Sequence, residues 1–179
     1  MSDLPRMLAS ECALLVIDMQ NGFVHPESAM GLSSSGTAAQ QETVPMIASL
    51  TEFCRAKNVP IVWSQQEHFP DDKTRVRKII RPHSSRQGFL PCLRGTWETE
   101  IFEDLRLVVK SVDHIVSKHR ASVFYNTNLE TKLRMLGTRF LLITGCNTEF
   151  CVESTVRDAY ARDFEIVVVD DGSSDDPGR

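Results

Sequence analysis

Five short apolar runs constrain the fold of this chain more than any other feature. Each run is nearly continuous and often β-branched, rather than alternating between apolar and polar residues. Such runs are typical of strands that are covered on both faces, as in a parallel sheet. The runs are CALLVID (12–18), VPIVWSQ (59–65), HIVSK (114–118), FLLITG (140–145) and EIVVVDD (165–171).

Between these runs, apolar residues recur at the spacing of an amphipathic helix. Three helices are expected: one ending near residues 57–58, one closed by Gly137 at a C-cap position, and one beginning near Cys151. Their apolar positions are Val44, Ile47, Ala48, Leu50 and Phe53; Leu129, Leu133 and Leu136; and Val152, Val156, Ala159 and Tyr160. Alternating strands and helices predict an α/β fold with right-handed βαβ units, in which a doubly wound, mainly parallel sheet forms a Rossmann-like three-layer structure.

Length, charge and composition favour one soluble domain over residues 1–179. A formal charge of -4 offers no basic surface for nucleic acid or for membranes. No apolar run approaches the roughly 20 residues of a membrane-spanning helix, and the first residues do not resemble a signal peptide. We therefore expect a cytoplasmic protein that binds neither nucleic acid nor membranes.

The cysteines are Cys12, Cys54, Cys92, Cys146 and Cys151. An odd number of scattered cysteines in a chain of this size fits reduced thiols. Cys146 and Cys151 have no second Cys or His pair downstream at zinc-finger spacing, which disfavours zinc. A redox-active disulfide between these two remains an alternative.

Two stretches lack a regular pattern. Residues 25–40 read as a long loop rich in Gly and Ser, and residues 70–100 are longer than a structureless connection should be. The second stretch is therefore expected to form a lid or an irregular wall.

Reactive side chains follow three of the predicted strands. Asp18 ends the first run, Lys118 ends the third, and Cys151 follows the fourth run by six residues. Ligands of open α/β sheets bind beyond the carboxyl ends of the strands, so these residues are expected at one edge. Lys118 and the helix near Cys151 could lower the pKa of the thiol, and Asp18 could accept its proton. The spacing alone leaves other roles open, because Asp18 could cap or pair, Lys118 could be solvated and Cys151 could be a core residue.

Three blocks of the sequence resemble a known family. They are ALLVIDMQNGF (13–23), VSKHRASVFYNTNLETKLRMLG (116–137) and TGCNTEFCVESTVRDAYARDFEIVVVDD (144–171). Together they resemble the isochorismatase-like cysteine hydrolases, which include nicotinamidases, N-carbamoylsarcosine amidases and ureidoacrylate and biuret hydrolases. The resemblance implies an Asp–Lys–Cys triad of Asp18, Lys118 and Cys151. It also implies a cis peptide between Cys146 and Asn147, and an oxyanion hole formed by the N–H groups of Asn147 and Cys151.

The resemblance also implies the type of reaction. Retention of Cys151 favours hydrolysis of the C–N bond of a small amide, ureide or carbamoyl compound through a thioester, rather than the ether cleavage of the isochorismatase branch. Nicotinamidases bind a metal through an Asp-x-His step after the second strand, but Gln66 stands at the Asp position here and only His68 remains. No metal and no cofactor are therefore expected.

Several residues near the triad are candidates for contact with substrate, although core packing is an equal alternative for the aromatic ones. They are Gln20, Phe23, His68, Trp97, Arg120 and Phe124. The chain reaches Arg179 without the final helix and sixth strand that are usual in the family, which predicts a homo-oligomer, a dimer or tetramer. The same feature leaves open a non-catalytic binding or scaffold homologue.

Overall fold

The computed structural model describes residues 11–73 and 90–174. Its strands are β1 (Cys12–Ile17), β2 (Ile61–Gln66), β3 (His114–Lys118), β4 (Phe140–Cys146) and β5 (Glu165–Ser174). Its helices are α2 (Asn21–Val24), α3 (Ala38–Ala56), η1 (Trp97–Thr99), α5 (Glu103–Arg106), α6 (Leu129–Met135), η2 (Thr148–Val152) and α7 (Glu153–Tyr160). All five predicted strands are present, each with bounds within three residues of the prediction.

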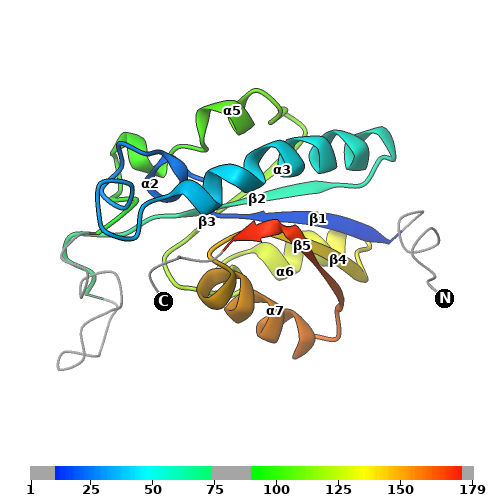
Figure 1. Cartoon of the computed structure of the whole chain (residues 1–179). Coiled ribbons are helices and arrows are strands. Elements are labelled where there is room, and N and C mark those ends of the chain that lie inside the picture. Colours follow the sequence, from blue (N-terminus) through cyan, green and yellow to red (C-terminus); the bar gives the residue numbers. More distant parts are fainter. Residues whose placement is uncertain (1–10, 74–89, 175–179) are drawn as a thin grey trace.

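The five strands of the described chain form one parallel sheet in the order β3-β2-β1-β4-β5. β1 lies at the centre, and the chain moves outward in one direction through β2 and β3, then in the other through β4 and β5. Figure 1 shows α2, α3 and α5 on one face of this sheet and α6 and α7 on the other. The predicted doubly wound α/β fold is confirmed.

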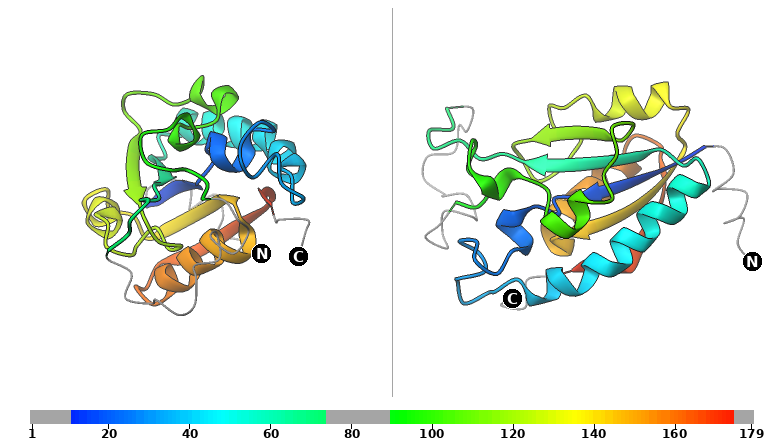
Figure 2. Two further views of the ribbon diagram at one scale, coloured as in Figure 1. Left: turned by 90° about the vertical axis from the view of Figure 1, so that its left-hand side faces the viewer. Right: turned by 90° about the horizontal axis from the view of Figure 1, so that it is seen from above.

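Residues of β1 alternate between the two layers of the core. Leu14 and Val16 pack with Ile47 of α3, whereas Leu15 and Ile17 belong to the cluster on the α6 and α7 side. The two views of Figure 2 show the sheet between these helical layers. Both faces of β1 are buried, which explains why its sequence is continuously apolar.

Two residues predicted on buried helix faces are exposed. Phe53 of α3 is 48% exposed and Tyr160 of α7 is 78% exposed. In α3 the buried stripe runs through Thr51 and Cys54, so Phe53 lies about 100° around the helix from Cys54. In α7 the buried stripe includes Ala159, which turns Tyr160 to solvent in the same way. Gly137 follows α6 with φ of 69°, as expected for a C-cap glycine.

The irregular stretches are only partly described. Residues 25–37 consist mainly of turns and bends, and residues 90–106 form turns, η1 and α5. The central part of the expected lid, residues 74–89, lies outside the described residues. Among the helices that are described, none is long and apolar enough to cross a membrane.

Candidate active site

The carboxyl ends of β1, β3 and β4 bring the predicted triad together. Asp18 follows β1 with φ of 53°, Lys118 is the last residue of β3, and Cys151 lies in η2, the turn of π-helix that follows β4. A glycine is required near the end of β4, because a Cβ at Gly145 would collide with the backbone oxygen of Ile17. This close approach holds the end of β4 directly against β1.

Lys118 is the centre of the site. Its Nζ lies 2.6 Å from Oδ2 of Asp18, and both side chains are fully buried. The same Nζ donates to Oε1 of Gln66 at 2.8 Å, to the backbone oxygen of Arg120 at 3.0 Å and to Sγ of Cys151 at 3.4 Å. Burial lowers the pKa of Lys118, but the charge of Asp18, together with the hydrogen bonds to Asp18 and Cys151, outweighs burial and raises it. Lys118 is therefore a buried ammonium ion with a paired charge.

The carboxylate of Asp18 is held by the second strand. Ser64 Oγ donates to Oδ1 of Asp18 at 2.5 Å and accepts the backbone N–H of Asp18 at 3.1 Å. Oδ2 has no hydrogen-bond partner of standard geometry in the described part of the chain, although it is ion-paired with Lys118. One oxygen is thus fixed by Ser64, and the other faces the ammonium group of Lys118.

Ser64 and Gln66 were missed as site residues by the sequence reasoning. They lie two residues apart in β2, so both side chains point to the same face of the sheet, and both are buried. Two buried polar residues at the end of an otherwise apolar strand were the available signal. Sequence alone could not show that their partners would be Asp18 and Lys118.

The thiol of Cys151 is less acidic than expected. Burial raises its pKa to about 12, and the lowering effect of Lys118 does not compensate, since hydrogen bonding and charge at Asp18 act in the opposite direction. Lys118 lowers the pKa of the thiol, as predicted, but the loss of hydration outweighs this effect. Burial thus favours the neutral thiol of Cys151 over its thiolate.

The peptide between Cys146 and Asn147 is cis, as the family resemblance implied. The thiol of Cys146 is buried and donates to the backbone oxygen of Asp18 at 3.4 Å, while Gln40 Nε2 donates to Oδ1 of Asn147 at 3.3 Å. Both Cys146 and Cys151 are free thiols in this structure. The roles of the Asn147 and Cys151 N–H groups in an oxyanion hole stay a prediction.

Three of the substrate candidates are engaged within the protein. The amide of Gln20 is buried: it accepts the N–H of Gln66 at 2.7 Å and donates to the backbone oxygens of Gln66 at 3.0 Å and Thr99 at 2.8 Å. Arg120 forms an ion pair with Asp72 at 2.8 Å. Phe124 is buried in the α6 and α7 cluster. Gln20 thus bridges β2 and η1, and direct contact of these residues with substrate stays a prediction.

None of the other three candidates is fully buried. Phe23 is partly buried and packs against the α3 side of the core. His68 Nδ1 lies 2.5 Å from the backbone oxygen of Pro91. Trp97 is 44% exposed and packs edge-on against the ring of His25. Their contact with substrate is likewise untested.

The residues at the metal position of nicotinamidases do not fit a metal. Gln66 uses its side-chain oxygen to bind Lys118, and Nδ1 of His68 is occupied by Pro91. Within residues 11–73 and 90–174, no group of three or more His, Cys, Asp or Glu side chains could hold a metal ion.

Comparison with known proteins identifies the family. A family model described as the isochorismatase domain matches residues 12–177. The chain belongs to the isochorismatase family. The predicted resemblance is confirmed, and it places this chain among hydrolases.

Three solved structures show how similar this isochorismatase-family chain is to others. N-carbamoylsarcosine amidase from Thermoplasma acidophilum is 28% identical with a TM-score of 0.77, and the match covers 92% of this chain and 84% of that one. An isochorismatase family protein from Desulfovibrio vulgaris is 32% identical with a TM-score of 0.76, and the match covers 94% of this chain and 85% of that one. A nicotinamidase from Bacillus subtilis is 26% identical with a TM-score of 0.75, and the match covers 92% of this chain and 87% of that one.

Proposed function

We propose that this chain hydrolyses the C–N bond of a small amide, ureide or carbamoyl compound, with Cys151 as the nucleophile. The observation that carries the proposal is the buried contact of Lys118 with both Asp18, at 2.6 Å, and Cys151, at 3.4 Å. An acid, an ammonium ion and a thiol in contact, out of water, are the groups that covalent acyl transfer requires. The amidases among the similar structures support this reaction class.

The first half of the proposed reaction forms a thioester. Oδ2 of Asp18 takes the thiol proton while Sγ of Cys151 attacks the carbonyl carbon, so that an S–C bond forms and the carbonyl electrons move to oxygen. The N–H groups of Asn147 and Cys151 would bind this oxyanion, and Lys118 balances the charge beside it. The C–N bond then breaks, and Asp18 returns the proton to the departing amine or ammonia.

The second half restores the thiol. Asp18 takes a proton from water as the water oxygen attacks the thioester carbon. The S–C bond breaks, the acid is released, and the proton on Asp18 returns to the sulfur. Because burial raises the pKa of Cys151, proton transfer to Asp18 would accompany attack, and the rate would depend on the orientation of Asp18.

A panel of amides and ureides tests this proposal, with ammonia release measured for wild type, Cys151→Ala and Cys54→Ala. Cys54 lies on α3, away from the triad, and is the matched control. We expect Cys151→Ala to lose at least about a thousandfold in kcat/KM and Cys54→Ala to keep its activity. Acid quenching during turnover should trap an acyl group on Cys151, detected by mass spectrometry. C–N hydrolysis that survives in Cys151→Ala would contradict the mechanism.

One observation favours a second candidate, a non-catalytic binding homologue. A buried thiol whose pKa is raised by burial is also what a core cysteine would show. Thermal stabilisation by an amide of the panel without any product would support this alternative. Cleavage of an ether substrate that continues in Cys151→Ala would instead indicate the ether-hydrolase branch.

A further inference from the structure

Gln66 supplies an oxygen atom that holds the ammonium group of Lys118 from the side of β2. The two residues are paired in the parallel register of β2 and β3, and both are buried. Oε1 of Gln66 accepts a hydrogen bond from Nζ of Lys118 at 2.8 Å, and Nε2 of Gln66 donates to the backbone oxygen of Glu67 at 3.4 Å. An ammonium group has donors alone, so the amide must present its oxygen, and not its N–H groups, to Lys118.

Three oxygen atoms surround the ammonium group of Lys118. Nζ lies 2.6 Å from Oδ2 of Asp18, 2.8 Å from Oε1 of Gln66 and 3.0 Å from the backbone oxygen of Arg120. Sγ of Cys151 is farther from Nζ, at 3.4 Å. Since an ammonium group has three N–H donors, the three oxygen atoms match them and fix the position of Nζ. The sulfur then interacts with Lys118 mainly through its charge.

Only one of these three oxygen atoms belongs to a carboxylate. Asp18 supplies it, whereas the amide of Gln66 and the backbone of Arg120 are neutral. In the proposed reaction Asp18 becomes neutral when it takes the thiol proton, so Lys118 is left to balance the thiolate of Cys151. A second carboxylate at position 66 would compete with the thiolate for this positive charge. A neutral amide leaves the charge available.

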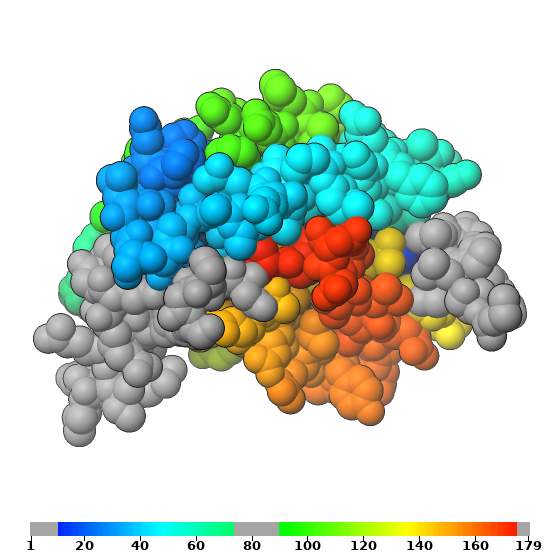
Figure 3. All heavy atoms as spheres, in the orientation of Figure 1, coloured from blue at the N-terminus to red at the C-terminus, as the bar shows by residue number. Residues whose placement is uncertain are grey.

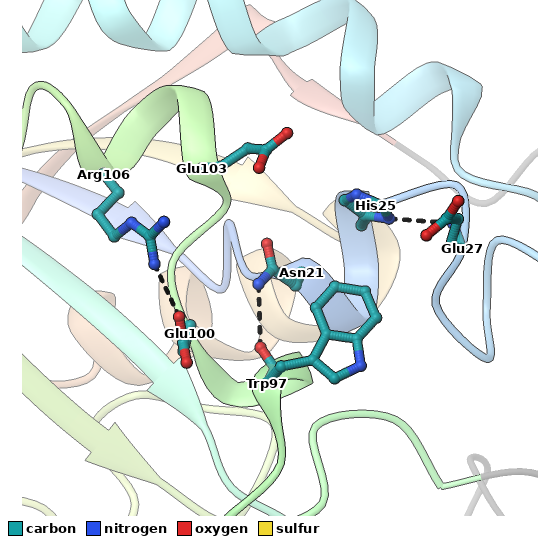
Figure 4. Close-up of a pocket in the computed structure, with 7 residues that line it drawn as sticks. All are labelled: Asn21, His25, Glu27, Trp97, Glu100, Glu103 and Arg106. Atoms are coloured by element: carbon teal, nitrogen blue, oxygen red, sulfur yellow. Dashed lines mark hydrogen bonds and ion pairs between the residues drawn. The ribbon is translucent and has the colours of Figure 1, made fainter.

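The backbone of Gln66 is held in turn by the side chain of Gln20. Oε1 of Gln20 accepts the N–H of Gln66 at 2.7 Å, and Nε2 of Gln20 donates to the backbone oxygens of Gln66 at 3.0 Å and Thr99 at 2.8 Å. The next residue, Asn21, donates from its amide to the backbone oxygen of Trp97 at 3.0 Å, as Figure 4 shows. The turn η1 thus anchors both side chains, and Gln20 transmits this anchoring to Gln66.

We propose that Gln66 is a positioning residue of the triad: it holds the ammonium group of Lys118 beside Cys151 through a neutral oxygen, and so leaves the charge of Lys118 free to balance the thiolate. This inference rests on the proposed hydrolase function where it concerns turnover. Its effect on the thiol belongs to the resting site and can be measured without a substrate.

Gln66→Glu and Gln66→Met separate the two parts of this role. Glutamate keeps an oxygen at the same place and adds a negative charge, whereas methionine has a similar length and removes the oxygen without adding charge. Gln41→Glu and Gln41→Met are the matched controls, because the amide of Gln41 on α3 donates to Oγ1 of Thr37 at 2.9 Å, outside the triad. Thermal unfolding curves verify that each variant is folded, and the uncharged methionine variant tests the proposal even if a buried glutamate prevents folding.

Iodoacetamide labelling of Cys151 from pH 7 to 9 is the first measurement. We expect Gln66→Glu to label at least about fivefold more slowly than wild type at each pH, because a buried negative charge opposes the thiolate. Gln66→Met should label about two- to fivefold more slowly, because its ammonium group is no longer held beside the sulfur. A residue that only filled space would loosen the site when replaced and speed labelling. A wild-type or faster rate in either folded Gln66 variant, or equal slowing in the Gln41 controls, overturns the proposal.

Turnover of an amide or ureide substrate is the second measurement. We expect the kcat of Gln66→Met to fall about tenfold while KM stays within about twofold, because the lost hydrogen bond orients a group of the triad. An unchanged kcat would overturn the positioning role. Hydrolysis that survives in Cys151→Ala, or no hydrolysis by wild type, would count against the proposed function alone, since the labelling rates still decide the role of Gln66.

Discussion

The hydroxyl of Ser64 donates a 2.5 Å hydrogen bond to Oδ1 of Asp18 and accepts the backbone N–H of the same residue at 3.1 Å. This double contact joins the second strand to the residue that follows the first. It fixes the carboxylate so that Oδ2 faces Lys118. Ser64 is therefore a positioning residue for the proposed base.

Ser64→Ala is expected to lower kcat by about 10- to 100-fold with little change in KM, because a hydrogen bond to a charged group contributes about 1.5–3 kcal/mol. Ser64→Thr retains the hydroxyl and should recover most of the activity. Ser117→Ala, an exposed serine on β3, serves as the control. A wild-type kcat in Ser64→Ala would show that Ser64 does not position Asp18.

The alkylation rate of Cys151 should rise steeply with pH. Burial raises its pKa to about 12, so the thiolate fraction increases about tenfold per pH unit between pH 7 and 9. Iodoacetamide labelling, followed at Cys151 by peptide mass spectrometry, should show this rise without a plateau. A plateau near pH 8 would mean that the thiol is far more acidic than its burial implies.

Lys118→Met should slow this labelling at every pH tested. The charge of Lys118 lowers the pKa of Cys151, so its removal raises that pKa further and reduces the thiolate fraction. Lys110→Met removes an exposed lysine and should leave the rate unchanged. Equal rates for wild type and Lys118→Met would argue against electrostatic contact between Lys118 and the thiol.

Conformational stability should fall above pH 9. Burial raises the pKa values of Cys12 and Cys54 to about 11, from 9.0 in the unfolded chain. Between pH 9 and 11 the unfolded chain therefore loses thiol protons that the folded chain keeps, which favours unfolding as the pH rises. Each such thiol contributes up to about 1.4 kcal/mol per pH unit to the slope.

Urea unfolding of wild type and Cys54→Ala at pH 8, 9 and 10 tests this expectation. The alanine variant starts from a lower stability because it leaves a cavity, but its stability should fall less steeply with pH. Glu52→Gln should keep the wild-type slope. Parallel slopes for wild type and Cys54→Ala would rule out a contribution from this thiol.

The expected homo-oligomer stays a prediction. Figure 3 shows β5 at the surface between α3 and α7, and Val168 of this edge strand is 41% exposed. Exposed strand edges favour association. Light scattering coupled to size-exclusion chromatography should give two or four times the monomer mass. Val168→Lys should reduce the measured mass. Leu107→Lys, at an exposed site after α5, is the control and should leave the mass unchanged. A monomeric wild type would refute the prediction.

Local patterns were sufficient to predict the order of strands and helices along the chain and the grouping of three reactive residues at one edge of the sheet. Strands buried on both faces need continuous apolar residues, so the five runs were visible without knowledge of their partners. Parallel strands place their carboxyl ends at one edge, which allowed Asp18, Lys118 and Cys151 to be grouped. The family resemblance added the cis peptide at Cys146.

Other properties of the site depend on residues far apart in the chain. Ser64 and Gln66 matter because β2 lies between β1 and β3, and only the sheet order brings them to Asp18 and Lys118. The pKa of Cys151 depends on how fully water is excluded, and this burial outweighs the nearby charge of Lys118. The sequence by itself determined which residues could react, whereas the tertiary structure decided their burial and orientation, because desolvation and hydrogen bonding are set by the packing of distant segments.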